Sequence, residues 1–317
     1  MMKKFLAEYI KKDGNRNVVL LIAYLIIQTA AFSILLPNFM TVSNFQNLMR
    51  QSAELGMVSI PLAIVLMTGN IDLSIGSVMG VCAISMARML RAGLPIPAAV
   101  LLTICIGALA GSLNGFCVAK LHLDGLVATI GTQVMLRGFC YILTGGRSVS
   151  GLPSEFTRVS KMYVLGVPIS FLLMLAIFAA AIFVMQKTRI GIQVHAVGYN
   201  ARASRFSGIE ADKIKFRLFV MSGCVAAIAS MFMLMRFASA ESEFASGYDT
   251  DTLVAILLGG IDIAGGSGNM LGAFLGLITV AILKNGLNHI GMTATYQQFI
   301  VGLLIVISAV RLPKKRD

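Results

Sequence analysis

The stretch from Val197 to Gly223 reads V-G-Y-N-A-R-A-S-R-F-S-G-I-E-A-D-K-I-K-F-R-L-F-V-M-S-G and is the longest run of this chain in which charge accumulates. Apolar segments lie on both sides of it, and Lys187 and Arg189 lie just upstream. Its basic residues are Arg202, Arg205, Lys213, Lys215 and Arg217. A basic stretch between two apolar segments predicts a corner that lies in water between two membrane-spanning helices.

Helix end signals within this stretch predict its local structure. Asn200 is expected to cap a short helix by accepting a backbone N–H two or three residues on, and Gly208 to close that helix in the left-handed conformation. A carboxylate at Glu210 or Asp212 favours the start of the next helix. One face of the short helix is expected to carry Arg202, Arg205 and Phe206. The stretch therefore predicts a compact helix–turn–helix corner at the membrane surface.

The composition of the whole chain is that of a membrane protein. Of its 317 residues, 57% are hydrophobic and 13% are charged, and the mean hydropathy is +0.85. Soluble domains rarely combine so few charges with so many apolar residues. The apolar residues form long runs without two-residue alternation, which favours helices over a β-barrel. We expect an all-α polytopic membrane protein, a single transmembrane domain over residues 1–317.

The apolar runs predict about ten transmembrane helices, some of them broken. They are Val18–Leu36, Leu48–Thr68, Ile75–Met89, Ile96–Ala119, Leu126–Leu143, Val167–Gln186, Ile214–Arg236, Thr252–Ile261, Met270–Ile290 and Tyr296–Val310. The eighth run is short and ends in glycine, so we expect a half-helix there. No small-x-small cleavage pattern follows the first run, which is therefore expected to be a retained anchor.

The distribution of Lys and Arg indicates the orientation. If residues 1–17 are cytoplasmic, the basic residues of segment 187–213 and of the tail 312–317 fall on the same side, and the cytoplasmic side holds the excess. Both termini are therefore expected in the cytoplasm. The net charge of +12 is explained by this topology, so we expect membrane lipid and no nucleic acid as a partner.

Signatures of catalysis are missing from the sequence. It has no G-x-x-x-x-G-K-[S/T] phosphate loop, so the chain is not expected to bind and split ATP itself. Its five cysteines all fall in apolar runs, and their spacing indicates neither a disulfide framework nor a metal site. We expect no enzyme activity, no cofactor and no metal.

Two glycine-rich stretches resemble each other and suggest an internal duplication. They read G-N-I-D-L-S-I-G from Gly69 to Gly76 and G-G-I-D-I-A-G-G from Gly259 to Gly266. Glycines and one carboxylate after an apolar run are typical of a broken helix, in which the aspartate caps the next helix. Discontinuous helices also carry the moving parts of many transporters. The candidate gating residues are Gly69, Asn70, Asp72, Gly76, Gly259, Gly260, Asp262, Gly265 and Gly266.

Polar side chains within the apolar runs are the next candidates for function. Glu54 and Arg137 are expected either to pair, which is the interpretation we favour, or to face a water-filled path. Neutral groups suited to the hydroxyls of a sugar are offered by Asn114, Thr129 and Gln133. Such Thr hydroxyls often bond only their own helix, so both a pathway role and a structural role stay open.

Two further patterns concern packing and docking. Gly107, Gly111 and Gly115 recur every four residues, which predicts a face for close helix packing. On the side opposite segment 187–213, acidic residues gather in the stretch 239–251. They are expected to form a solvated loop, or to help dock an external solute-binding protein by charge complementarity. These residues are Glu241, Glu243, Asp249 and Asp251.

Several motifs together resemble the ribose-type permeases of ABC importers. The corner matches through Gly198, Asn200, Ala203, Ser207, Gly208 and Ile209. The stretch at Gly69 resembles that family's T-G-G-I-D-L-S-V-G signature with Asn70 replacing a glycine, and L-L-G-G-I-D-I-A-G-G-S-G-N-M-L-G resembles its second glycine-rich run. The motifs N-G-L-N-H-I-G and Y-Q-Q resemble its last two helices.

This resemblance implies a membrane subunit of the plasma (inner) membrane that imports a monosaccharide or similar solute. It implies that separate ATP-binding subunits dock on the corner, through Gly198, Asn200, Arg202, Ala203, Arg205, Phe206, Gly208 and Ile209. It also implies a dimer with a second copy or a related permease, and a periplasmic solute-binding protein. The substrate and the dimer partner stay undetermined.

Two other functions remain open from the sequence. A branched-chain amino-acid ABC permease shares this distant architecture. An ion-coupled secondary carrier needs no ATPase, and Asp72 and Asp262 would then be its coupling carboxylates. ATP-independent uptake by the purified chain would favour the carrier.

Overall fold

The structure is a computed structural model that describes residues 13–309, and it is built almost entirely of helices. Each of the ten predicted apolar segments overlaps one helix. These helices are α2 (Asp13–Leu35), α3 (Val42–Met67), α4 (Ile75–Arg91), α5 (Ile96–Ala119), α6 (Gly125–Thr144), α8 (Ile169–Lys187), α11 (Ala211–Phe237), α12 (Tyr248–Leu258), α13 (Met270–His289) and α14 (Ala294–Ala309). Most of the expected N-terminal segment 1–17 and the whole tail 312–317 lie outside the described residues.

Six of the described helices are long and apolar enough to cross a membrane. They are α2, α5, α6, α8, α11 and α13. The all-α, multi-pass class predicted from composition is therefore confirmed. Helix α12 has only 11 residues, too few to cross a bilayer of about 30 Å at 1.5 Å per residue. The prediction of a short, glycine-terminated half-helix is confirmed in this respect.

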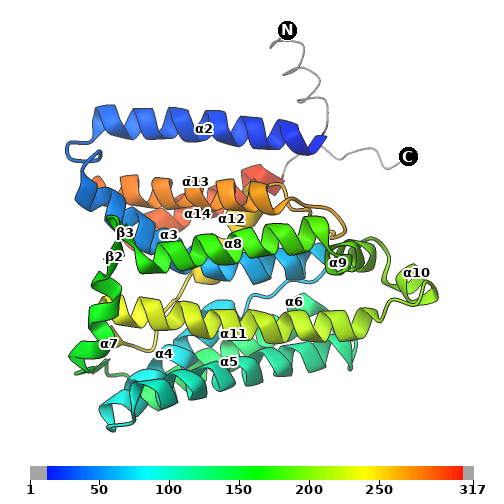
Figure 1. Ribbon diagram of the computed structural model, residues 1–317, viewed down its shortest axis with the longest axis horizontal. Helices are drawn as coiled ribbons and strands as arrows, with labels where there is room; N and C mark the ends of the chain where they lie inside the picture. Colours follow the sequence, from blue (N-terminus) through cyan, green and yellow to red (C-terminus); the bar gives the residue numbers. More distant parts are fainter. Residues whose placement is uncertain (1–12, 310–317) are drawn as a thin grey trace.

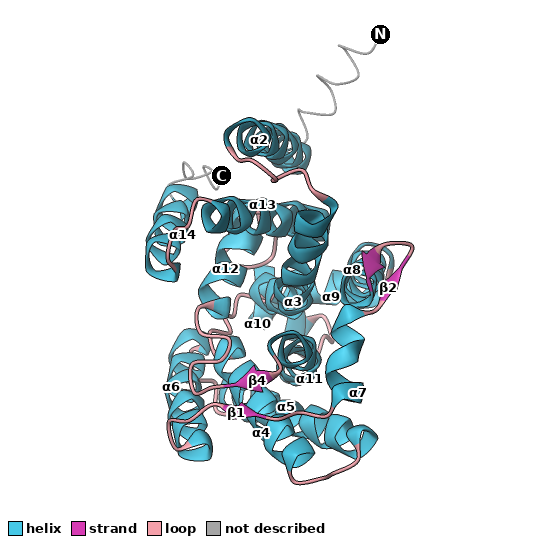
Figure 2. Ribbon diagram, turned by 90° about the vertical axis from the view of Figure 1, so that its left-hand side faces the viewer, coloured by secondary structure: helices cyan, strands magenta, loops and turns pink. Residues whose placement is uncertain are grey.

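The long helices run side by side along one direction (Figure 1). Helix α3 lies in the middle of the bundle, and every residue from Ser52 to Met67 is buried. Helix α2 packs against α13 at one edge, whereas at the other edge α4 and α5 pack against α11, and α6 packs against α4 and α5 (Figure 2). A central helix such as α3 tolerates polar residues because other helices, rather than lipid, surround it.

The predicted glycine face of α5 packs against α11. A Cβ atom on Gly107 would lie 2.3 Å from the carbonyl oxygen of Gly223, and one on Gly111 would lie 2.3 Å from that of Phe219. At Gly115 a Cβ would lie 3.0 Å from the Phe216 ring. The absence of side chains thus lets the two backbones touch, and the predicted packing role is confirmed.

The two ends of the bundle differ. The short helices α9 (Arg189–Tyr199) and α10 (Ala201–Phe206) lie at the end of the bundle at which α2 starts (Figure 1). At the opposite end, α7 (Ser154–Arg158) and η1 (Val159–Lys161) lie near two small antiparallel sheets. Strand β1 (Val149–Ser150) pairs with β4 (Ser239–Ala240), and β2 (Tyr163–Val164) pairs with β3 (Val167–Pro168).

Candidate functional site

The corner between α9 and α10 has the predicted local structure. The Asn200 side-chain oxygen accepts from the backbone N–H groups of Arg202 and Ala203, both at 3.0 Å. Gly208 has a φ of +80°, and the Ile209 N–H donates to the Ser204 carbonyl at 3.0 Å. The cap and the left-handed closure predicted from the sequence are therefore confirmed.

The exposed face of this corner combines an aromatic ring with basic groups. The side chain of Phe206 is 95% exposed, and Tyr199 is 73% exposed. Arg205 donates to Asp212 at 2.6 Å, which ties α10 to the first turn of α11. Arg202 is exposed beside them. An apolar ring held almost fully in water at the tip of a rigid corner is a suitable anchor for a partner protein.

The two glycine-rich stretches meet each other behind this corner. The Gly266 N–H donates to the Met67 carbonyl at 2.8 Å. A Cβ on Gly265 would lie only 2.5 Å from the backbone nitrogen of Gly69. The sequence placed these stretches in separate halves of the chain, and the structure brings them into direct backbone contact.

Helix α9 is the third member of this junction. A Cβ on Gly198 would lie 1.9 Å from the Met67 oxygen and 2.4 Å from the Gly266 nitrogen. The His195 Nδ1 lies 2.9 Å from the Gly266 carbonyl oxygen, and the Tyr199 ring covers the same glycine. Since closely packed backbones transmit displacement, a movement of α9 is expected to move both glycine-rich loops.

Both glycine-rich stretches end a helix in the same way. At the end of α3, Gly69 has a φ of +75° and the Asn70 N–H donates to the Val65 carbonyl. At the end of α12, Gly260 has a φ of +86° and the N–H of the next residue donates to the Ile256 carbonyl. These are Schellman-type closures. When the two sequences are aligned on their shared Ile-Asp pair, Asn70 corresponds to Gly260. In the structure, however, the residue that corresponds to Gly260 in the left-handed conformation is Gly69, one position earlier.

The aspartates of the two stretches have different environments. Asp72 is buried, and its carboxylate accepts from the Ser74 N–H (3.1 Å), the Ser74 hydroxyl (2.6 Å) and the Ser222 hydroxyl (2.8 Å). Burial raises the pKa of this carboxyl group, whereas the serine hydrogen bonds lower it. Asp262 is exposed and accepts from the N–H of Ala264 within its own loop.

The expected capping role of Asp262 is wrong. Helix α13 is capped by Asn269, whose side-chain oxygen accepts from the Leu271 N–H at 2.9 Å. The physical reason is distance along the chain, because the loop after Asp262 continues through Gly265, Gly266 and Gly268 before α13 begins.

Two of the three candidate pathway residues hold the loop at Asp72 in place. Asn114 is fully buried, donates to the Ser74 hydroxyl at 2.7 Å and accepts from the Thr132 hydroxyl at 2.7 Å. Thr129 is also fully buried and donates to the Ile71 carbonyl at 3.2 Å. Their polar atoms are engaged within the protein, so the geometry favours a structural role for both.

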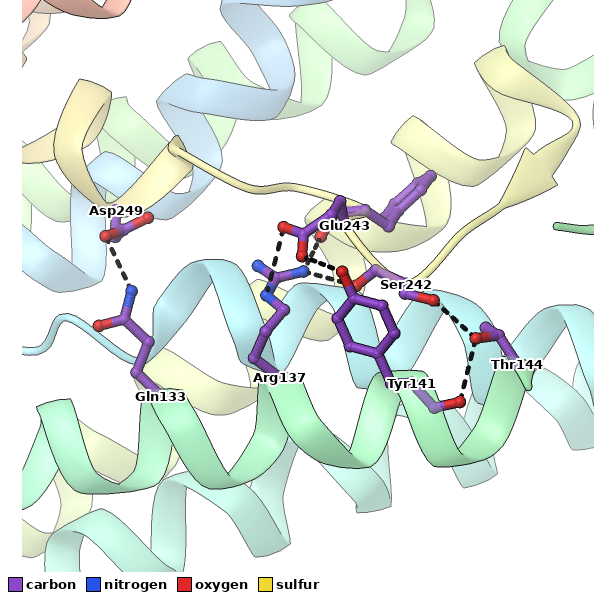
Figure 3. Close-up of polar contacts among 8 residues, drawn as sticks. Gln133, Arg137, Tyr141, Thr144, Ser242, Glu243 and Asp249 are labelled. Atoms are coloured by element: carbon purple, nitrogen blue, oxygen red, sulfur yellow. Dashed lines mark hydrogen bonds and ion pairs between the residues drawn. The ribbon is translucent and has the colours of Figure 1, made fainter. Parts of the chain in front are cut away.

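The third candidate, Gln133, begins a row of polar contacts along α6 (Figure 3). Gln133 donates to the Asp249 carboxylate at 3.1 Å. Two turns further on, the Tyr141 hydroxyl donates to Glu243 at 2.8 Å. Thr144 and Ser242 share a hydrogen bond of 2.7 Å. This face of α6 therefore holds residues 242–249, the segment that leads into α12 and includes its first two residues.

Arg137 lies in the same row and does not pair with Glu54. Its guanidinium donates to the carbonyl oxygens of Ser242 and Phe244, each at 2.9 Å, and lies 4.0 Å from Glu243. The expected Glu54–Arg137 pair is wrong. Spacing along the sequence placed both groups at membrane depth, but it did not show which helices are neighbours.

Glu54 instead pairs with a residue at the end of α11. Its two carboxylate oxygens accept from Arg236 Nε and Nη2, both at 2.7 Å, and the Tyr248 hydroxyl donates to it at 3.1 Å. Glu54 is only 2% exposed. The bidentate geometry compensates the buried charge, which supports the structural interpretation of Glu54.

The acidic stretch 239–251 is only partly a solvated loop. Glu241 and Glu243 are exposed, but Asp249 and Asp251 lie buried in the first turn of α12. Asp251 forms an ion pair with Lys284 of α13. The solvated-loop interpretation is therefore wrong for these two aspartates, because they have partners on α6 and α13.

Two adjoining cavities open between α3, α12, α13 and α14, at the end of the bundle opposite α9 and α10. One, of about 250 Å³, is bordered by Gln51, Arg236, Tyr248, Asp251, Lys284 and Gln297, among others. The other, of about 420 Å³, is bordered by Asn44, Asn47, Gln51, Asn285, Asn288 and His289. Apart from Asp251 of the acidic stretch, sequence reasoning assigned these residues no role, although Asn285, Asn288, His289 and Gln297 belong to the motifs N-G-L-N-H-I-G and Y-Q-Q.

Comparisons with known proteins agree on one family. Residues 44–309 match the model of the family described as branched-chain amino acid transport system / permease component. The chain is 32% identical to the ribose import permease protein RbsC of Haemophilus influenzae, over 90% of this chain and 89% of that protein. It is 32% identical to RbsC of Escherichia coli K12, over 92% of each.

A further relative is named for the import of a different solute. The chain is 29% identical to the autoinducer 2 import system permease protein LsrD of Salmonella typhi, over 92% of this chain and 90% of that protein. No solved structure matches the chain.

Proposed function

Because the chain belongs to the family of branched-chain amino acid transport system permease components, we propose that it is the membrane-spanning permease subunit of an ABC importer for a monosaccharide or similar sugar-like solute. Transport would be driven by ATP hydrolysis on separate subunits. The relatives named above are import permeases for ribose and autoinducer 2, which favours a sugar-like solute over the amino acids in the family's description.

The observation that carries this proposal is the contact between Gly198 and the two glycine-rich loops. An importer of this kind needs a rigid element that passes movement from an ATPase into the membrane. Helix α9 touches the ends of both α3 and the loop after α12, and it continues into α10 with its exposed Phe206. ATP binding would shift the equilibrium between inward-open and outward-open states through its different affinity for the two.

The remaining parts of the proposal follow from the orientation. The ten helices would all cross or enter the inner membrane, with both termini and the α9–α10 corner in the cytoplasm. The opposite end, with its small sheets and the exposed Glu241 and Glu243, would face a periplasmic solute-binding protein. A second copy or a related permease would complete the translocation path.

The test uses one substitution at each end of the bundle. Phe206→Asp places a charge on the exposed tip of α10, and Leu165→Asp makes the same kind of change at a 99% exposed loop residue of the opposite end. Tagged wild-type and variant chains are purified from native membranes in mild detergent, and copurifying proteins are identified by mass spectrometry. We expect an ATP-binding subunit with the wild type and with Leu165→Asp, and its loss with Phe206→Asp.

Two results would contradict the proposal. If an ATP-binding subunit copurifies equally with all three chains, α10 is not the docking element. If none copurifies with any chain, and the purified chain alone carries out solute uptake in proteoliposomes with an ion gradient, the protein is a secondary carrier.

A further inference from the structure

We propose that the two adjoining cavities between α3, α12, α13 and α14 form a low-affinity binding subsite for an uncharged, polyhydroxylated solute. This inference rests on the proposed function, because it places a step of solute transfer in this subunit. The subsite lies at the end of the bundle opposite the α9–α10 corner, where a solute would enter an importer.

The charges around the cavities are already paired. Arg236 is held by both carboxylate oxygens of Glu54, and Lys284 is held by Asp251. A zwitterionic amino acid would have to compete with these ion pairs for both of its charged groups. The cavity walls therefore do not favour the binding of charged ligands, since breaking a partly buried ion pair leaves one charge uncompensated.

Several neutral amides around the cavities keep hydrogen-bonding groups available. Within residues 13–309, the side chains of Asn47 and Gln51 make no hydrogen bond. Gln297 donates to the Asn288 oxygen at 2.6 Å and to a backbone carbonyl, which leaves the Gln297 oxygen and the Asn288 amide nitrogen available. A carboxamide both donates and accepts, so these groups match hydroxyls, which also do both.

The position and the lining of the two cavities favour a ligand-binding site over a solvent-filled depression of the surface. Gln51 borders both cavities and is half-buried at the point where the fully buried part of α3 begins. The smaller cavity also has apolar walls, from Leu55, Phe237 and Ala281. Its volume of about 250 Å³ is slightly below that of typical pockets for drug-sized ligands, about 300 to 1,000 Å³. A small solute with one polar and one apolar face fits these walls.

Asn44 and Asn285 form one boundary of the subsite. Each side chain donates to the oxygen of the other, at 3.0 and 2.9 Å, so this pair closes one wall rather than offering free groups. The residues that would contact the solute are therefore Asn47, Gln51, Asn288 and Gln297.

The test measures binding to the purified full-length permease in nanodiscs, by ligand-observed NMR titration. The probes are D-ribose, D-xylose and myo-inositol, with L-leucine as the zwitterionic comparison. The variants are Gln51→Leu and Asn288→Leu. Gln186→Leu makes the same change at an exposed residue of α8 at the other end of the bundle and serves as the control.

We expect at least one polyol to bind the wild type and Gln186→Leu equally. Each cavity substitution should weaken that binding by about three- to tenfold, the effect of one lost hydrogen bond. The subsite is overturned if polyol binding is the same in all variants, if no probe binds, or if only L-leucine binds. Copurification of an ATP-binding subunit is measured without any solute, so failure of the subsite and failure of the importer proposal are distinguishable.

Discussion

Gly198 of α9 lies so close to Met67 of α3 that a Cβ atom on the glycine would be 1.9 Å from the methionine carbonyl oxygen. The backbone nitrogen of Gly266 lies 2.4 Å from the same Cβ position of Gly198. Three segments far apart in the sequence thus meet at one glycine, at the cytoplasmic end of the proposed orientation.

Gly198→Ala is expected to disturb this junction. The added methyl group meets backbone atoms, which cannot move aside as the end of a flexible side chain can. We expect solute uptake by the assembled transporter to fall by about fivefold or more, because α9 must shift and such overpacking costs about 1–3 kcal/mol. Gly138→Ala is the control, since nothing lies within 4 Å of its Cβ position. Equal uptake by both variants would show that the contact is not needed for transport.

Substitution of Asp72 distinguishes the proposed ABC importer from an ion-coupled secondary carrier. In Asp72→Asn the side-chain oxygen still accepts from Ser74, and the amide donates to the Ser222 hydroxyl, so we expect nearly normal thermal stability and uptake. In Asp72→Ala these donors lose their acceptor, at a cost of about 1–3 kcal/mol for each one left buried and unpaired. Thermal unfolding and uptake are measured for both. Loss of uptake in a fully stable Asp72→Asn chain would instead indicate a coupling carboxylate.

The partner of Glu54 can be identified by double substitution. Glu54→Met leaves Arg236 without its carboxylate and is expected to lower the free energy of unfolding by about 3–5 kcal/mol. Glu54→Met with Arg236→Met removes both charges and should recover most of this loss. The combination with Arg137→Met should recover none, because Arg137 binds the carbonyls of Ser242 and Phe244. Thermal unfolding in detergent is measured for Glu54→Met and for its two combinations. If stability is recovered in the combination with Arg137→Met and not in the one with Arg236→Met, the observed pairing is contradicted.

Close packing of α5 on α11 makes Gly107 sensitive to size. A Cβ atom there would be 2.3 Å from the Gly223 oxygen and 2.8 Å from the Ala227 side chain, so Gly107→Val should separate the helices and lower stability by about 1–3 kcal/mol or more. Gly131→Val of α6, with nothing within 4 Å of its Cβ position, controls for the substitution itself. Thermal unfolding of the two variants in the same detergent is the measurement. Equal melting temperatures would show that α5 and α11 do not pack through this glycine.

The sequence by itself determined what depends on neighbouring residues in the chain. Apolar runs located the helices, including the short α12, since hydropathy and length set which segments leave water. The cap at Asn200 and the turn at Gly208 were also predictable, because both rely on atoms within one helical turn. The close packing of Gly107 and Gly111 followed from their four-residue spacing, which places small residues on one face of a helix.

The tertiary structure alone decided the partners. Glu54 and Arg236 are 182 residues apart, and only the arrangement of helices shows that they meet and that Arg137 does not. The same holds for Asp251 and Lys284, and for the junction of Gly198 with Gly266. The sequence gives the depth of a polar group from its distance to the helix ends, but the direction in which it points and the helix that it faces are set by packing over the whole bundle.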